Sequence, residues 1–126
     1  MSKFQNKYGY FSDDGGEYII TDFKTPKPWV NVLSNGSYGL IISQVGGGFS
    51  WDTHSEFNRI NRWHQDLIKD DWGKYFYIKN NKTNEIFSPT WMPVKTELNN
   101  YKCTYGLGYT RFNAIYKNIE IELTIF

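Results

Sequence analysis

The residues whose chemistry stands out are aromatic rings beside amide and guanidinium groups near the middle of the chain. The set consists of Trp51, Asn58, Arg59, Asn61, Arg62, Trp63, His64 and Gln65. A sugar offers an apolar C–H face on which an aromatic ring can stack, and hydroxyls that amide and guanidinium groups can bind. We therefore take as candidates for contact with a carbohydrate or with another domain Trp51, Arg59, Arg62, Trp63 and Gln65. The competing interpretation makes both tryptophans core rings and pairs Arg59 with a carboxylate.

Other kinds of site find less support in the sequence. His54 and His64 do not have the spacing of a zinc motif, so we interpret them as surface histidines. The triple glycine at residues 46–48 precedes Phe49 in an apolar run rather than a helix, which excludes the usual phosphate-binding loop. The acidic pairs at residues 13–14 and 70–71 fall in predicted turns, where turn chemistry accounts for them. We assign no catalytic residue and no metal ligand, and we expect no cofactor.

Composition limits the class of protein. The chain has 126 residues, which suits one domain, and a net charge of +1 from 14 basic and 13 acidic residues. This balance predicts no binding to nucleic acid or to an anionic membrane. No apolar run reaches the roughly 18 residues that a membrane span needs, and the first residues lack an apolar signal core, so we expect a cytoplasmic chain. The single cysteine, Cys103, is interpreted as a small buried apolar residue.

Nearly every segment has the pattern of a β-strand. Aromatic residues make up 19% of the chain and short apolar runs alternate with Gly, Asn and Pro, which predicts an all-β antiparallel sandwich with a core rich in rings. Asn35-Gly36 predicts a hairpin because both residues tolerate positive φ. The triple glycine is either a loose turn or a place where backbone passes close to another surface, and both can hold. Residues 56–69 are the one candidate helix, with an irregular loop as the alternative.

The last segment predicts a half-buried strand. Ile119, Ile121, Leu123 and Ile125 alternate with polar side chains, after a predicted hairpin turn at residues 117–118. The sequence stops inside this strand, which would leave the edge of a sheet exposed. We therefore expect this chain to be the first part of a longer protein, with a sandwich that is incomplete. The alternative is a terminal strand held between two neighbours.

Five segments, in order, strongly resemble the start of the inverting glycoside phosphorylases of glycoside hydrolase family 94. These are the cellobiose, chitobiose and laminaribiose phosphorylases and their relatives. The segments are residues 28–33 (PWVNVL), 47–60 (GGFSWDTHSEFNRI), 73–79 (GKYFYIK), 87–95 (FSPTWMPVK) and 101–111 (YKCTYGLGYTR). Residues 7–11 and 17–21 also look like the N-terminus of that family. The resemblance covers nearly the whole chain.

The resemblance implies that residues 1–126 are the N-terminal part of a supersandwich-type β-domain in a longer enzyme. In that family a catalytic (α/α)6 barrel follows, which is absent from this chain. The barrel cleaves β-glucosides with inorganic phosphate as co-substrate and inverts the anomeric centre, because an Asp protonates the leaving oxygen while phosphate attacks the opposite face. The expected partners are the rest of the phosphorylase, β-glucoside sugars and a second subunit of a homodimer.

The sequence departs from the cellobiose type in the stretch that holds the candidate site. Phe49-Ser50-Trp51, followed by residues 62–66 (RWHQD), replaces a tyrosine-rich stretch and leans towards the cyclic-glucan-synthase or laminaribiose-like branch. The main expectation is a non-catalytic part of a glycoside phosphorylase. The alternative, from another class, is a free-standing β-sandwich module that binds carbohydrate or protein.

Overall fold

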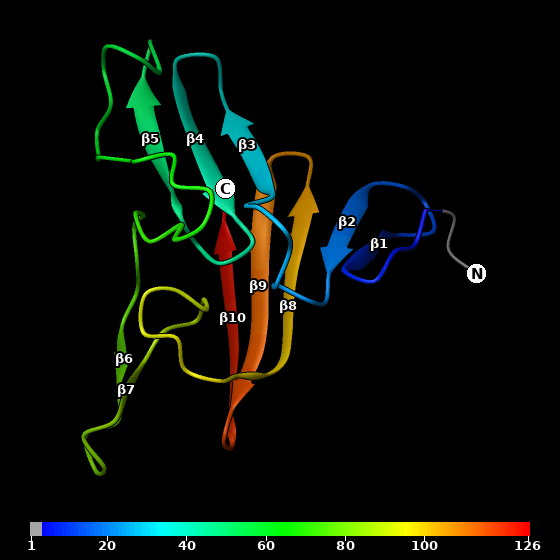
Figure 1. Cartoon of the computed structure of the whole chain (residues 1–126), viewed down its shortest axis with the longest axis vertical. Coiled ribbons are helices and arrows are strands. Elements are labelled where there is room, and N and C mark those ends of the chain that lie inside the picture. The colour runs from blue at the N-terminus through cyan, green and yellow to red at the C-terminus, as the bar shows by residue number, and fades with distance from the viewer. Residues whose placement is uncertain (1–3) are drawn as a thin grey trace.

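The computed structural model describes residues 4–126, and within that range it contains strands and no helix (Figure 1). The strands are β1 (Gly9–Phe11), β2 (Glu17–Ile20), β3 (Val30–Ser34), β4 (Tyr38–Ser43), β5 (Gly48–Asp52), β6 (Ile78–Lys79), β7 (Ile86–Phe87), β8 (Asn99–Gly106), β9 (Tyr109–Tyr116) and β10 (Ile119–Ile125). All pairings between these strands are antiparallel. The prediction of an all-β antiparallel fold is therefore confirmed.

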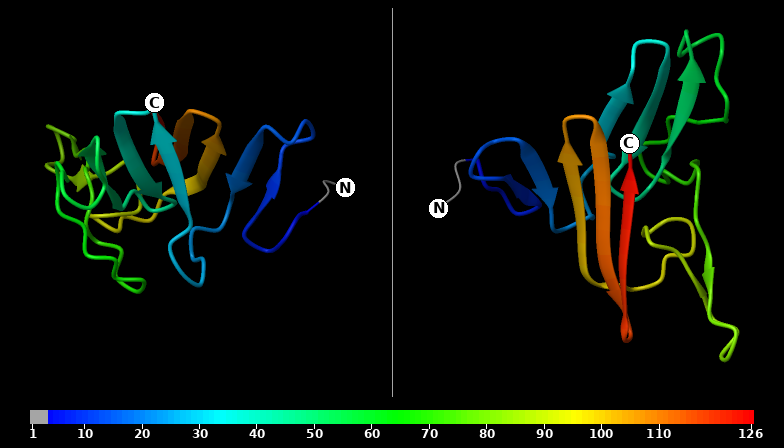
Figure 2. Two further views of the ribbon diagram at one scale, coloured as in Figure 1. Left: turned by 90° about the horizontal axis from the view of Figure 1, so that it is seen from above. Right: turned by 180° about the vertical axis from the view of Figure 1, so that it is seen from behind.

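The strands form two main sheets and a small hairpin, which the two views of Figure 2 separate. One sheet has five strands in the order β1-β2-β8-β9-β10, and the other has three in the order β3-β4-β5. The β6–β7 hairpin extends beside them and is tied to the main sheets at its end. Phe87 stacks on Tyr116 with ring centroids 4.3 Å apart, and Lys117 forms an ion pair of 2.5 Å with Glu85.

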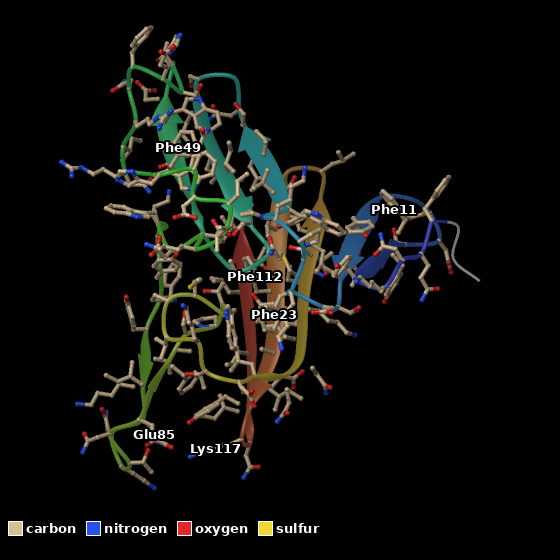
Figure 3. All side chains as sticks on the ribbon, viewed as in Figure 1. Phe11, Phe23, Phe49, Glu85, Phe112 and Lys117 are labelled. Atoms are coloured by element: carbon tan, nitrogen blue, oxygen red, sulfur yellow. The ribbon has the colours of Figure 1, made fainter. Side chains whose placement is uncertain are left out.

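The core lies between the five-stranded and three-stranded sheets. Ile20, Phe112 and Cys103 come from the larger sheet and are fully buried, and Leu40 and Ile42 of β4 contact them from the smaller one. Figure 3 labels Phe112 at the centre of the packed side chains. Cys103 is buried as predicted, and burial raises the pKa of its thiol, which therefore stays protonated.

Polar side chains also join the two sheets. The Asn31 amide on β3 donates to the carbonyl oxygens of Gly106 and Tyr109, at 3.2 and 3.0 Å. The hydroxyl of Tyr105 donates to the Trp29 carbonyl at 2.6 Å, and that of Tyr101 to the Gln44 carbonyl at 2.8 Å. The Asn31 bonds satisfy carbonyl groups at the turn between β8 and β9, and the two tyrosine bonds satisfy carbonyl groups just before β3 and just after β4. Together they fix how one sheet lies on the other.

The turns confirm two predicted hairpins. β3 and β4 are joined at Asn35-Gly36, where Gly36 takes a φ of 99°. Asn35 does not take a positive φ. It stabilises the turn through its side chain, whose Oδ1 accepts the N–H groups of Ser37 and Tyr38. β9 and β10 are joined at residues 117–118, and Lys117 takes a φ of 53°.

The structure decides between the alternatives that the sequence left open at two places. Residues 56–69 form turns and irregular backbone rather than a helix, as poor helix formers such as Asn58 and Asn61 allow. The alternative of a terminal strand between two neighbours also fails, because β10 lies at the edge of its sheet and pairs only with β9 among the described strands. From Ile121 onward, β10 alternates as predicted, and Ile121 itself is buried. Ile119, at the start of the strand, is exposed.

The triple glycine makes a turn, as one interpretation has it, and the surfaces that come close to its backbone belong to this chain. Residues 46–48 make the turn from β4 to β5, and neighbouring backbone approaches so closely that a side chain would not fit. A Cβ on Gly48 would lie 2.0 Å from the Ile41 carbonyl oxygen, and one on Gly47 would lie 2.3 Å from the Asp70 carboxylate. A chain segment from beyond β5 is therefore seated directly on this turn.

Asp70 anchors that segment. It is only 8% exposed, although its position beside Asp71 predicts a surface turn. The Ser43 hydroxyl donates a short hydrogen bond to its carboxylate and accepts the N–H of Gly47 at 3.0 Å. Trp72, two residues on, accepts the N–H of Gly48 through its carbonyl at 2.7 Å. The loop between β5 and β6 is held against the small sheet at this point.

We predict that Phe112→Ala lowers the free energy of unfolding by about 3–5 kcal/mol, because it opens a cavity in the middle of the core. The measurement is urea unfolding followed by tryptophan fluorescence. Phe57→Ala is the matched control, since the Phe57 ring is 79% exposed, and its effect should stay within about 0.5 kcal/mol. Equal effects of the two substitutions would contradict the placement of the core.

We predict that Asp70 makes stability fall as pH rises. Burial raises the pKa of its carboxyl above 3.8, against the effect of the Ser43 hydrogen bond. The folded chain then holds this proton more tightly than the unfolded chain does. The contribution of Asp70 to stability is therefore complete at a pH below its pKa in the unfolded chain, and it is lost as the pH rises through its higher pKa in the folded chain. The unfolding free energy of the unsubstituted chain minus that of Asp70→Asn should decrease as the pH rises above 3.8 in urea titrations. A constant or increasing difference would be the contrary result.

Candidate functional site

The candidate residues gather on the outer face of the three-stranded sheet. Phe49 pairs with Ile41, which pairs with Val32, and these three side chains point away from the core that Leu33 and Leu40 face. Val32 is 56% exposed, whereas Phe49 is buried because the loop after β5 folds back over it. Figure 3 labels Phe49 among the side chains of this loop.

Three of the five predicted residues converge on the ring of Phe49. The Trp63 ring stacks on it with centroids 5.0 Å apart and planes 22° apart. The guanidinium carbon of Arg59 lies 4.7 Å from its centroid, and the Trp51 ring lies 5.3 Å away. We call these four residues the Phe49 cluster. Phe49 was not among the predicted site residues. The sequence pattern that could have identified it is the alternation of a β-strand, which places Phe49 and Trp51 on the same face of the sheet.

Trp51 has a second task in the sheet. Its ring lies across Gly39 on the neighbouring strand, where a Cβ would be only 2.2 Å from the indole Cζ2. An aromatic ring that covers a glycine on the next strand stabilises the pair of strands. Trp51 is half-buried, so part of the competing interpretation, that it serves packing, applies to it.

Arg59 does not pair with a carboxylate among the described residues. Its Nε donates to the Ser55 carbonyl at 2.8 Å while its plane lies over Phe49. The Arg59 side chain is exposed, so its other guanidinium N–H groups are accessible. A guanidinium held over an aromatic ring has restricted freedom and can bind a hydroxyl or carboxylate at little entropic cost.

Arg62 and Gln65 are placed differently from each other. Arg62 is exposed and lines an open concavity of about 500 Å³ beside Arg59 and Trp63. Gln65 is also exposed, but it does not line this concavity. The structure therefore brings together four of the five predicted residues, with Gln65 beyond the margin of the group.

The backbone that carries these side chains completes the edge of β5. The Asn61 amide imitates a strand, since its Oδ1 accepts the N–H of Ser50 at 2.9 Å and its Nδ2 donates to the Gly48 carbonyl at 3.2 Å. Next to it, the N–H of Ile60 donates to the Ser50 carbonyl at 2.8 Å. Asn61 is thus a positioning residue. It fixes the loop from which Arg59, Arg62 and Trp63 extend.

The arrangement is suited to binding rather than to acid–base chemistry. Its groups are rings and guanidiniums, which can stack on an apolar face and donate hydrogen bonds. His64 lies against the Trp72 ring, 4.7 Å between centroids, and His54 Nδ1 accepts the N–H of Glu56 at 3.2 Å. In the part of the chain that the structure covers, no group of three or more His, Cys, Asp or Glu side chains could hold a metal ion. No helix in that part is long and apolar enough to cross a membrane.

Comparison with known proteins gives one family and several relatives. Residues 16–126 match the family described as glycosyl hydrolase 94, supersandwich domain. An N,N'-diacetylchitobiose phosphorylase of Vibrio furnissii is 34% identical over 122 residues, which cover 95% of this chain and 15% of that protein. A solabiose phosphorylase of Paenibacillus borealis is 32% identical (94% and 16%), and the cyclic β-(1,2)-glucan synthase NdvB of Rhizobium meliloti is 30% identical (94% and 4%).

The matches cover most of this chain but only a small part of the relatives. The family match takes in most of the chain, including every strand from β2 to β10. The chain nevertheless spans only about one sixth or less of the length of the relatives just described. The relatives include phosphorylases and a glucan synthase, so the leaning towards one branch stays a prediction. The chain belongs to the supersandwich-domain family of glycosyl hydrolase family 94.

Proposed function

We propose that this chain is the N-terminal part of the β-sandwich domain of an inverting glycoside phosphorylase and is not catalytic alone. The observation that carries the proposal is the match of 95% of this chain to a phosphorylase of which it spans 15%. In this proposal the catalytic barrel, the Asp acid and the groups that bind inorganic phosphate lie outside residues 1–126. The sandwich supports the barrel and the interface of a homodimer, and the enzyme acts on β-glucosides in the cytoplasm.

The Phe49 cluster, with Arg62, is proposed as the surface that meets a sugar or a neighbouring domain. Support comes from Trp63, which is half-buried with one face on Phe49, and from two exposed guanidiniums beside it. Trp51 serves mainly to hold β5 on β4 through Gly39. Gln65 stays a candidate at the margin. Sugar recognition needs this combination of an apolar plane and directed donors.

The half-buried Trp63 also favours the alternative of a free-standing carbohydrate-binding module, so the two functions need separate tests. We predict that the chain alone, mixed with inorganic phosphate and N,N'-diacetylchitobiose or cellobiose, consumes no phosphate. The reason is that the acid and the phosphate-binding groups are proposed to lie outside this chain. Release of a sugar phosphate would refute the proposal. Strong binding of the chain alone on a glycan array would favour the free-standing module.

The contact role of Arg62 can be tested in a chimera. In it, this chain replaces the matching segment of the Vibrio furnissii phosphorylase. We predict that the chimera consumes phosphate with N,N'-diacetylchitobiose, and that Arg62→Ala raises its KM for the sugar about three- to tenfold with little change in kcat. The loss of one hydrogen bond made equally in ground and transition states has this effect.

The matched control is Arg111→Ala, because Arg111 lies on β9 of the other sheet, with its guanidinium 5.2 Å from the Tyr109 ring. Its KM should be unchanged. If Arg62→Ala instead lowers the melting temperature or dissociates the dimer at constant KM, Arg62 is a domain contact and not a sugar contact. If neither substitution has any effect, the concavity has no part in binding.

A further inference from the structure

A second concavity lies where the segment after β2 faces the start of β8. Its volume is about 510 Å³, within the range of roughly 300–1,000 Å³ that is typical of ligand sites. One wall is residues 21–24, and the other holds Leu98, Asn100, Tyr101 and Lys102. We call it the Phe23 concavity. It shares no residue with the concavity beside the Phe49 cluster, and Figure 3 labels Phe23 and Phe49 in different parts of the molecule.

Both walls are fixed by Gln44, which is buried. The Gln44 Nε2 donates to the Phe23 carbonyl at 3.1 Å, and the Gln44 backbone carbonyl accepts the Tyr101 hydroxyl at 2.8 Å. The N–H of Asp22 also donates to the Tyr8 carbonyl, at 3.1 Å, which holds the first wall against β1. The concavity therefore has its shape before a ligand binds, so that binding requires little ordering of the chain.

An aromatic ring lies between the two walls. Trp91 stacks on Phe23 with ring centroids 4.5 Å apart and planes 29° apart, and the Tyr101 ring meets Phe23 edge-on at 5.4 Å. Phe23 is half-buried and lines the concavity, whereas Trp91 does not line it. The part of the Phe23 ring that Trp91 leaves free is therefore available to a flat apolar surface of a ligand.

A β-bulge at the second wall places an amide in the concavity. Asn100 and Tyr101 of β8 lie opposite a single residue of β9, Ala114. Tyr101 is buried, whereas Asn100 is exposed and takes a φ of 52°, which few residues other than Gly and Asn adopt. The Asn100 side-chain amide has no hydrogen-bond partner within residues 4–126. Bulges redirect side chains and are frequent beside functional sites.

Charged side chains complete the rim. Asp22 is half-buried, and its Oδ1 accepts the N–H of Lys24 at 2.9 Å, so its second oxygen can accept from a ligand. The ammonium groups of Lys24 and Lys102 are donors. With the Asn100 amide, the rim offers acceptors as well as donors. A hydroxyl group needs both, because it can donate and accept at the same time.

We propose that the Phe23 concavity is a second carbohydrate site, which binds a β-linked glucoside chain with one pyranose ring on Phe23. In β-linked glucopyranose the hydroxyls are equatorial, so each face of the ring presents C–H groups. One such face stacks on Phe23 while hydroxyls at the edge bind the side chains of Asn100 and Asp22. This inference goes beyond the proposed function, because it involves neither the Phe49 cluster nor a catalytic group.

Other ligands fit the Phe23 concavity less well. An anion would meet two lysines but also the Asp22 carboxylate, which repels it. An apolar segment of another domain would bury Asp22, Lys24 and the Asn100 amide without partners, and the desolvation of such groups costs free energy. A saccharide matches both the ring and the mixed polar rim.

NMR titration of the isotope-labelled chain with cellotriose tests the proposal. We expect chemical-shift changes at the amides of residues 21–24 and 98–102, with a dissociation constant on the order of 1 mM. Sorbitol, which has similar hydroxyls but no ring face, should not cause these changes. Binding this weak differs from the strong binding on a glycan array that would favour a free-standing module. If cellotriose leaves residues 21–24 and 98–102 unchanged, the proposal is wrong.

Asn100→Gly removes the amide and keeps the backbone, because glycine adopts the same φ without a steric cost. We expect it to raise the dissociation constant for cellotriose about three- to tenfold, through the loss of one hydrogen bond. Asn84→Gly is the matched control, since Asn84 is also exposed, has a φ of 59° and lies between β6 and β7. Its dissociation constant should be unchanged. Equal effects of the two substitutions would overturn the proposal.

Results that assign the sugar or the concavity elsewhere can be distinguished. Shift changes confined to residues 59–64 would assign the sugar to the Phe49 cluster and overturn this proposal alone. Slower hydrogen exchange at residues 98–102 in the chimera than in the chain alone would make the concavity a contact with another domain, and would also overturn it. Phosphate consumption by the chimera does not depend on the Phe23 concavity, so its failure bears on the proposed function alone.

Discussion

The absence of side chains at residues 46–48 is the constraint on which the rest of the structure depends. The backbone of β4 and the Asp70 carboxylate both approach this turn to distances that exclude a Cβ. Asp70 in turn reaches Ser43, and Trp72 reaches Gly48, so the loop after β5 is fastened where β4 ends and β5 begins. A side chain at this turn would separate the loop from the sheet, and the candidate site would lose its support.

That fastening explains why the Phe49 cluster lies on the outer face. The loop is held at Asp70 and at Asn61, and the stretch between these points must pass over the small sheet. Trp63 from this stretch and Arg59 just before it cover the ring of Phe49, and burial of this ring stabilises the crossing. The same contacts therefore pack the loop on the sheet and hold the Phe49 cluster at the outer face. This is why the two interpretations of the tryptophans are not exclusive.

The sequence predicts the regular part of the fold because strand alternation and hairpin turns are local. Ile121 and its neighbours alternate, and Gly36 occupies the turn that it was expected to make. The sequence left helix and irregular loop open for residues 56–69, because a spacing of apolar residues does not show that Asn61 is needed at the edge of β5. Asp70 was missed for the same reason, since its partner Ser43 lies 27 positions away and a neighbouring Asp suggests the surface. Long-range pairing of polar groups leaves no local pattern.

Two of the four edge strands of the main sheets, β5 and β10, end their sheets in different ways. Where the chain supplies a cover, as Asn61 does for β5, the backbone groups are satisfied and the outer face is free to carry a site. At β10, which pairs only with β9 among the described strands, the outward backbone groups are accompanied by half-buried Leu123. Water can satisfy backbone groups at such an edge, whereas the edge of β5 has partners within the chain that do not depend on solvent.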